Sequence, residues 1–308
     1  MTSQTPVFFF TATFLHAFAQ KYYDALANAQ ESKHLDAFKQ FLYNSYGSVL
    51  LDRELKLADY PMLRRVFRSD GPQYSVYTME EDTSYLDSEL QAIDKFTASF
   101  SDRLSGSQIT ALESQFQRPL FNLERVEQGW HYLAGHDTKT LAEGSEHDWE
   151  SFLGPFLVPT SQVILCDGYL STNLSKVRRN LIPLIHALKS LVQFQGQIVL
   201  ISTKPAFGDL RQLFQDEFGD SLNFQLVLVE STSIKVEHDR RLVTDSQLLN
   251  IPTGFDIVND RGIVTRNTEP RLISIFSGDK NQVATHSRLR SSLIEDANKL
   301  IARGAASG

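Results

Sequence analysis

The stretch Val163-Ile164-Leu165-Cys166-Asp167-Gly168-Tyr169 opens the part of the chain whose fold the sequence predicts most directly. Its four apolar residues predict a buried strand, and the Asp-Gly-Tyr that follows predicts a turn into a helix. In that helix the apolar residues recur at three- and four-residue intervals, as expected for one buried face, and Pro183 marks a possible kink: Val177, Leu181, Leu184, Ile185, Leu188 and Leu191.

The same pattern continues beyond Gly196. Residues 197–202 form a second apolar run, residues 209–218 read as a helix, and residues 223–229 form a third apolar run. Strands that alternate with helices predict a parallel sheet with right-handed crossovers, covered on both faces. Residues 241–244, 255–258, 262–265 and 272–276 read as short strands separated by turn residues, and residues 288–302 read as a final helix.

Upstream of residue 163, helical spacing dominates. Helices are predicted over residues 18–29, 35–43, 85–104, 108–116 and 120–134, with a short one over 149–157 that breaks at Gly154-Pro155. The apolar run 7–19 contains two Thr and one His and follows no basic residue, so it predicts a buried strand or helix rather than a signal peptide or membrane span. The polar stretch 136–150 predicts a boundary. We therefore expect an α/β chain with an α-rich (α+β) region over 1–145 and a sheet domain over 146–308.

Composition limits the class of protein. With 308 residues, 42% of them hydrophobic and 22% charged, the chain is expected to fold into one large or two ordinary domains and not to be disordered. The net charge of -7 is unevenly placed: residues 1–150 hold 13 basic and 22 acidic residues, and the remainder holds 17 and 15. Any anionic ligand is thus expected in the second half, and a protein partner on the acidic first half.

The single Cys166 lies inside an apolar run and cannot form an internal disulfide. A chain with one cysteine fits a reducing compartment, so we expect a cytoplasmic protein without a transmembrane segment. Burial in apolar surroundings raises a thiol pKa, so we expect Cys166 to be a core residue and not a nucleophile. No motif indicates a cofactor, and the His-Asp dipeptides at 136–137 and 147–148 lack the partners of a metal site.

The residues with most chemical interest follow the third strand. His238, Arg240 and Asp245 have the spacing His-x-Arg-x4-Asp. On an extended chain His238 and Arg240 share a face, where a His can attack or protonate phosphorus and an Arg can bind two phosphate oxygens. Asp245 is an odd number of residues further on, so it needs a bend to reach the same pocket.

These residues and their surroundings resemble the phospholipase D-like superfamily, whose signature is His-x-Lys-x4-Asp. Within it, residues 149–257 look most like the non-catalytic C-terminal domain of MIT-domain proteins. The likeness includes the strand ending in Asp167, the apolar strand ending in Ser202-Thr203, the Ser-Thr-Ser at 231–233, and the Gly-Phe-Asp at 254–256. The resemblance implies a phospholipase D-like sheet with flanking helices and a phosphate-binding site at the carboxyl ends of its strands.

Two departures from the superfamily pattern affect the expected activity. Arg240 stands in place of Lys, and Gly254-Phe255-Asp256 replaces the Gly-Ser-x-Asn of active members. Asp256 would repel a phosphate unless it pairs with Arg240, Arg241 or a neighbouring cation. Active members use two signatures, and this chain has one, so hydrolysis through a phosphohistidine on His238 would require a homodimer.

Three hypotheses follow from the sequence. The protein recognises a phosphate-bearing ligand (nucleic acid or acidic lipid headgroup) or a protein partner without catalysis; or it is a homodimeric phosphodiesterase or nuclease; or it is a scaffold subunit. The expected catalytic set is His238, Arg240 and Asp245. The expected ligand-binding set is Asp167, Lys204, Arg241, Gly254 and Asp256. A structural alternative is also open, in which Arg240 pairs with Asp167 or Asp256 and His238 caps the sheet.

Overall fold

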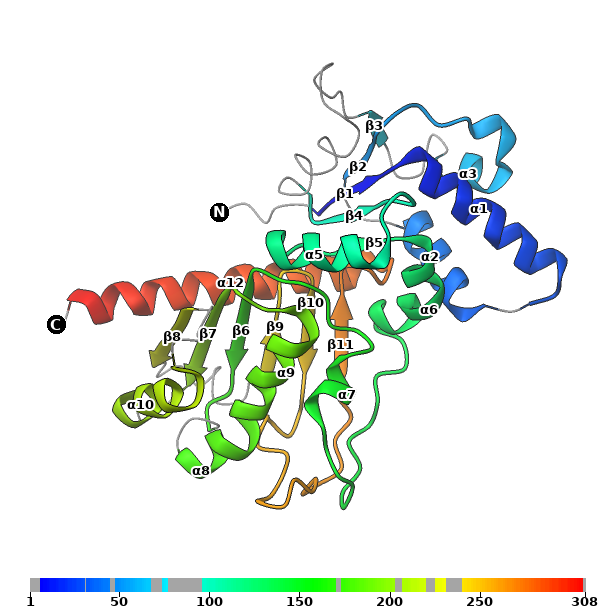
Figure 1. Cartoon of the computed structure of the whole chain (residues 1–308). Coiled ribbons are helices and arrows are strands. Elements are labelled where there is room, and N and C mark those ends of the chain that lie inside the picture. Colours follow the sequence, from blue (N-terminus) through cyan, green and yellow to red (C-terminus); the bar gives the residue numbers. More distant parts are fainter. Residues whose placement is uncertain are drawn as a thin grey trace. The chain divides into compact units, whose positions relative to one another are not determined.

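The computed structural model describes residues 6–30, 32–44, 48–67, 74–76, 96–169, 173–202, 207–219, 225–230 and 240–306 (Figure 1). The chain divides into two compact units. The C-terminal unit contains residues 137–273 and 286–308, and the N-terminal unit contains residues 2–136 and 274–285. The chain thus passes from the N-terminal to the C-terminal unit after residue 136, whereas the sequence predicted the boundary after residue 145. The sequence did not predict that residues 274–285 belong to the N-terminal unit.

A six-stranded sheet with the order β11-β10-β9-β6-β7-β8 forms the centre of the C-terminal unit (Figure 1). Strands β6 (Gln162–Cys166), β7 (Gln197–Ser202) and β8 (Gln225–Glu230) are parallel neighbours. The connections contain α8 (Leu174–Lys176), the π-helical segment η3 (Val177–Leu181), α9 (Ile182–Val192) and α10 (Phe207–Phe218). The predicted alternation of strands and helices is confirmed. Pro183 is the second residue of α9 and lies in its first turn, where a proline without an N–H is tolerated.

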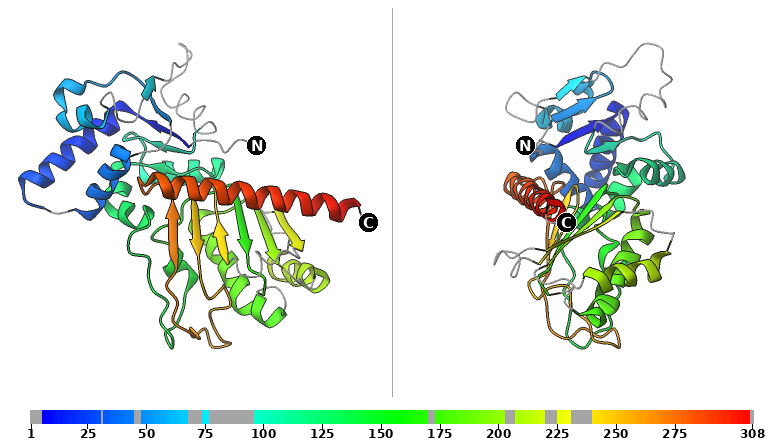
Figure 2. Two further views of the ribbon diagram at one scale, coloured as in Figure 1. Left: turned by 180° about the vertical axis from the view of Figure 1, so that it is seen from behind. Right: turned by 90° about the vertical axis from the view of Figure 1, so that its left-hand side faces the viewer.

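Both faces of β6 and β7 are covered, which explains why these two strands read as continuous apolar runs. Val163, Leu165 and Leu200 pack against helices α9 and α10 and against α7 (Trp149–Leu153). The alternate residues Ile164 and Cys166 pack against the second half of α12 (Lys280–Ala306), which lies across the opposite face (Figure 2). Cys166 is fully buried, as expected.

The remaining strands of the C-terminal unit extend the sheet beyond β6. β9 (Arg241–Val243) is antiparallel to β6, β10 (Gln247–Asn250) is antiparallel to β9, and β11 (Arg271–Ser274) lies at the edge. The predicted strands 255–258 and 262–265 are present only as isolated bridges, between Val258 and Val264 and between Glu146 and Ile263. These residues form a long loop rather than further strands.

The N-terminal unit is built on a parallel sheet with the order β3-β2-β1-β4-β5. Its strands are β1 (Val7–Phe10), β2 (Ser48–Leu51), β3 (Tyr74–Val76), β4 (Ala98–Phe100) and β5 (Leu120–Phe121). Its helices are α1 (Ala12–Ala27), α2 (Lys33–Asn44), the short η1 (Leu57–Asp59), α3 (Pro61–Val66), α5 (Gly106–Phe116) and α6 (Leu123–Leu133). The expectation of an α-rich region did not include this five-stranded sheet.

Two helix predictions in this unit were wrong in part. Residues 98–100 of the predicted helix 85–104 form strand β4, and residues 77–95 lie outside the described residues. Phe96, Phe100 and Leu104 are all buried, and their spacing of four fits a period of two as well as a helical period. In the predicted helix 120–134, Leu120–Phe121 form β5, and the helix begins at Leu123.

The core of the N-terminal unit is aromatic. Phe10 stacks on Phe100 at a centroid distance of 4.3 Å, and Trp130 meets Phe38 edge-on at 4.6 Å. Phe276, from the returning segment 274–285, packs against Trp130 at 5.5 Å. The run 7–19 contributes β1 and the start of α1 to this core, in line with the prediction of a buried strand or helix. Among the described helices, none is both long and apolar enough to cross a membrane.

His286 couples the stability of the C-terminal unit to pH. Its side chain is buried, and Nε2 donates a hydrogen bond to the Thr244 carbonyl oxygen at 3.2 Å. Burial lowers the pKa of His286 to about 4, against smaller opposing effects that include this hydrogen bond and the charge of Asp245. Below pH 6.5 the unfolded chain therefore gains a proton that the folded chain accepts only near pH 4.

We therefore expect the free energy of unfolding to fall as the pH drops from about 6.5 to 4, by on the order of 3 kcal/mol from this residue. Urea denaturation of wild type and His286→Gln across this range measures the effect. The variant lacks the ionisable group, so its stability should fall less steeply than that of wild type. Two parallel pH profiles would contradict the assignment to His286.

Candidate functional site

The candidate site lies where β6 ends and β9 begins. The antiparallel register pairs Cys166 with Arg241, so Arg240 and Asp167 are at the same edge of the sheet. This edge holds the carboxyl ends of β6, β7 and β8, where ligands of parallel sheets bind. Of the residues predicted for the site, His238 and Lys204 lie outside the described residues. Arg241 lies at the first position of β9.

Asp167 holds the two loops of this edge together. Its carboxylate is 2% exposed. Oδ1 accepts a hydrogen bond from the Tyr169 backbone N–H and Oδ2 accepts one from the Phe255 N–H, both at 2.9 Å. The first bond forms the turn after β6, and the second fixes the loop after β10. Asp167 is therefore a turn former, as its place after the strand suggested, and it also fixes the loop after β10; its pairing with Arg240 stays a prediction.

Gly254 allows Arg240 to lie close to this carboxylate. Its φ of +87° is in the left-handed region, and a Cβ at this position would lie 2.9 Å from Asp167 Oδ2 and 3.1 Å from Arg240 Cδ. The three predicted residues Asp167, Arg240 and Gly254 thus meet at one point. The Arg240 guanidinium donates from Nη1 to the Pro252 carbonyl oxygen at 2.8 Å.

A second guanidinium binds the next carbonyl of the same turn. Arg266 donates from Nη2 to the Thr253 carbonyl oxygen at 3.0 Å. Sequence reasoning missed Arg266, because it belongs to no motif and directly follows the predicted strand 262–265. The one indication in the sequence is that Arg266 is a basic residue shortly after Gly254-Phe255-Asp256. The turn at Pro252-Thr253 therefore gathers two guanidinium groups.

Asp256, whose charge would repel a phosphate, is paired with two neighbouring cations. Oδ2 lies 3.0 Å from Lys176 Nζ, and Oδ1 lies 3.0 Å from Arg179 Nη2. Burial raises the pKa of the Asp256 carboxyl, but the hydrogen bonds and charges of Arg179 and Lys176 outweigh it and leave this pKa below its ordinary value. The carboxylate is therefore ionised and bridged by two positive charges at neutral pH.

Asn180 completes the support of this loop from the π-helical segment. It is fully buried; Nδ2 donates to Asp256 Oδ1 at 3.0 Å, and Oδ1 accepts from the Ile257 and Val258 N–H groups, each at 3.1 Å. π-helical turns often mark functional positions, because the widened turn redirects a side chain. Here it directs Asn180 to the backbone of the loop that follows Gly254.

Asp245 is separate from this edge. Its backbone N–H donates to Thr160 Oγ1 at 3.0 Å, which places it beside the start of β6. Its carboxylate accepts from the Ser161 N–H at 2.6 Å and lies 2.6 Å from Arg290 Nη2 of α12. Since Arg240 is beside the end of β6, about five residues of extended chain, roughly 16 Å, separate it from Asp245. The structure does not bring Arg240 and Asp245 into one pocket.

We expect Asp245→Ala to lower the free energy of unfolding by about 2–4 kcal/mol, because it leaves the Arg290 charge partly buried without its partner. The side chains are 12% and 28% exposed for Asp245 and Arg290. Asp260→Ala is the matched control, since that carboxylate is 84% exposed and its loss should cost less than about 0.5 kcal/mol. Chemical denaturation measures both, and equal effects would argue against a structural Asp245.

A pair of glycines tests the contact at the Arg240 site. Gly254 and Gly262 both have positive φ, but a Cβ at Gly262 meets nothing within 4 Å. Both Gly→Ala variants should lose about 1 kcal/mol from backbone strain. Gly254→Ala should lose more, because its Cβ displaces Asp167 or Arg240. Thermal denaturation of the two variants measures the difference, and equal losses would show that the close approach at Gly254 has no energetic role.

Comparisons with known proteins add no assignment. No model of a known protein family matches the chain, and no curated protein matches it in sequence. The phospholipase D-like resemblance therefore stays a prediction from the residues that suggested it. A functional proposal therefore rests on how Arg240 and Arg266 are arranged at the Pro252-Thr253 turn.

Proposed function

We propose that the protein binds a phosphate-bearing ligand at Arg240 and Arg266 and does not hydrolyse it. The observation that carries this proposal is the placement of two guanidinium groups on the successive carbonyls of Pro252 and Thr253, at the carboxyl edge of the sheet. Among the described residues each donates one hydrogen bond, to a neutral acceptor. A guanidinium has five N–H donors, so each keeps donors that can bind phosphate oxygens in a fork.

The charge around the site supports an anionic ligand. The Asp167 carboxylate is buried and directed to the Tyr169 and Phe255 N–H groups. The Asp256 carboxylate is bridged by Lys176 and Arg179. The two cations offset the repulsion that Asp256 would exert on a phosphate, while Arg240 and Arg266 remain on the turn. The shared chemistry of the ligand is a phosphate group, of a nucleic acid or of an acidic lipid headgroup.

The absence of catalysis is proposed on two grounds. Hydrolysis through a phosphohistidine needs one His to attack phosphorus and another to protonate the leaving oxygen, and the His-x-Arg-x4-Asp signature occurs once. In addition, Asp245 is engaged by Ser161 and Arg290 at the other end of β6, so it is not positioned to orient a group beside Arg240. Arg240 and Arg266 can bind a phosphate without these catalytic groups, so we propose binding without hydrolysis.

Binding measurements with Arg240→Ala, Arg266→Ala and Arg261→Ala test the proposal. All three remove one positive charge, and Arg261, exposed in the same loop, is the control. Isothermal titration calorimetry would use single-stranded DNA, RNA, inorganic phosphate and phosphatidic acid vesicles. We expect Arg240→Ala and Arg266→Ala to weaken binding by about 10- to 100-fold, the loss of a charge-assisted pair, and Arg261→Ala to change it by less than about threefold.

Two results would contradict this function. If wild type binds none of these probes, Arg240 and Arg266 do not form a phosphate site. If wild type cleaves a phosphodiester and His238→Ala abolishes cleavage, the protein is an enzyme, and its oligomeric state then shows whether two copies supply the two histidines. The probe that binds also distinguishes a nucleic-acid ligand from a lipid headgroup.

A further inference from the structure

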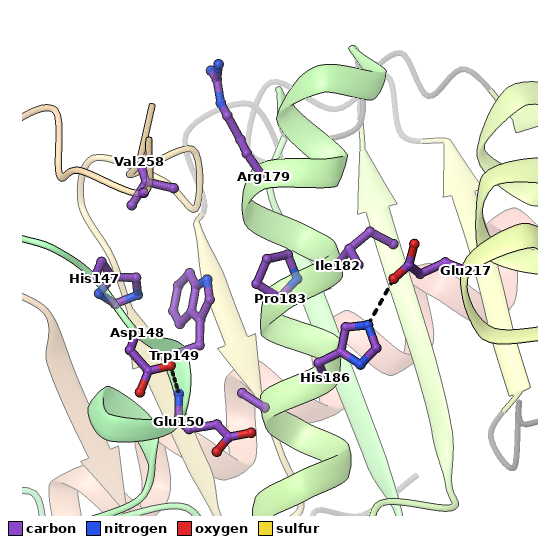
Figure 3. Close-up of a pocket in the computed structure, with 12 residues that line it drawn as sticks. His147, Asp148, Trp149, Glu150, Arg179, Ile182, Pro183, His186, Glu217 and Val258 are labelled. Carbon is purple, nitrogen blue, oxygen red and sulfur yellow. Dashed lines mark hydrogen bonds and ion pairs between the residues drawn. The ribbon is translucent and has the colours of Figure 1, made fainter. Parts of the chain in front are cut away.

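The C-terminal unit also contains a cavity, the α9 pocket, which is not lined by Arg240 or Arg266. It has a volume of 480 Å³ and is formed by the start of α7, one face of α9, the end of α10 and the loop 258–262 (Figure 3). Cavities of roughly 300–1,000 Å³ are those that hold small organic ligands in proteins. Arg179, which holds Asp256, also lines this pocket, but Arg240 and Arg266 do not.

One wall of the pocket is apolar and contains two nitrogen atoms without partners. Trp149 is 3% exposed, yet its indole Nε1 has no hydrogen-bond partner among the described residues, and the same holds for Nε2 of His147. The two rings meet edge-on at 4.6 Å, and Figure 3 shows them side by side at one end of the pocket. An indole N–H can only donate, so an acceptor atom is required to satisfy Trp149.

The rim of the pocket presents hydrogen-bond acceptors, whereas the Trp149 indole can only donate. Glu150 and Glu217 contribute carboxylates, and Glu217 Oε1 lies 3.2 Å from His186 Nε2 (Figure 3). Burial lowers the pKa of His147 to about 4, so this imidazole is uncharged at neutral pH. Arg179 also lines the pocket, but its guanidinium is paired with Asp256 and Asp260, so the carboxylates of Glu150 and Glu217 are the groups that can accept hydrogen bonds from a ligand.

We propose that the α9 pocket binds a neutral nitrogen heterocycle that carries a ring acceptor beside an amino group, as cytosine and adenine do. The ring packs between Trp149 and the apolar side chains of Ile182, Pro183 and Val258. The ring acceptor takes the Trp149 N–H, and the amino group donates to a carboxylate of the rim. This pocket goes beyond the phosphate site and does not depend on it.

The two tryptophans of the chain make the pocket observable. Trp130 lies in the aromatic core of the N-terminal unit, so in Trp130→Phe the only tryptophan is Trp149. Its fluorescence is followed while cytidine, uridine, adenosine or inosine is added. Uridine and inosine match cytidine and adenosine in size but carry a carbonyl in place of the amino group. We expect saturable changes with cytidine or adenosine and at least about tenfold weaker binding of uridine and inosine.

Calorimetry on the otherwise wild-type chain provides the controls. Trp149→Phe keeps an aromatic ring but lacks the N–H, and it should weaken cytidine or adenosine binding about tenfold or more. Trp130→Phe loses an indole N–H in the core of the N-terminal unit and should bind cytidine or adenosine as wild type does. Arg240→Ala should also bind these nucleosides as wild type does. Equal binding of cytidine and uridine, no binding of any nucleoside at millimolar concentration, or no effect of Trp149→Phe would overturn the proposal. None of these outcomes bears on the phosphate site, whose test uses Arg240 and Arg266.

Discussion

The hydrogen bond from the Phe255 N–H to the buried carboxylate of Asp167 is the interaction on which the ligand-side edge depends. It joins the end of β6 to a loop 88 residues further along the chain. A buried carboxylate is costly to desolvate, and two backbone N–H donors at 2.9 Å offset part of that cost. The bond requires a residue without a side chain at Gly254, and through Gly254 it sets the position of Arg240. Lys176, Arg179 and Asn180 then hold the next residues of the loop from the opposite side.

The sequence predicted the centre of the C-terminal unit well, for a physical reason. Strands β6 and β7 are covered on both faces, so their central residues form continuous apolar runs, and a helix of amphipathic spacing separates them. Strand β4 in the N-terminal unit was not predicted, because Phe96 and Phe100 are buried at a spacing of four, which fits a strand and a helix equally. Short parallel strands such as β5, with two residues, leave almost no periodic signal.

The candidate site could be predicted only in part. Spacing brought Arg240 under consideration, and the resemblance to the phospholipase D-like superfamily added Asp167, Gly254 and Asp256; the structure places these residues around one loop. Spacing could not reveal that β9 runs antiparallel to β6, which carries Asp245 away from Arg240 toward Ser161. Arg266 and Trp149 were beyond reach for another reason. Their roles come from a backbone carbonyl and an unpaired N–H, and neither leaves a pattern in the sequence.

The return of residues 274–285 to the N-terminal unit has a consequence for how the protein is made. Phe276 packs against Phe8, Phe41, Phe121 and Trp130, so the aromatic core of that unit includes a residue translated long after the rest. Domains generally fold as they emerge from the ribosome, the N-terminal one first. Here the first domain to emerge lacks part of its core until nearly the whole polypeptide has been synthesised. A chain that ends before residues 274–285 would lack Phe276 and expose an incomplete aromatic cluster. Chaperone binding to the nascent chain is therefore expected to persist until these residues have been synthesised.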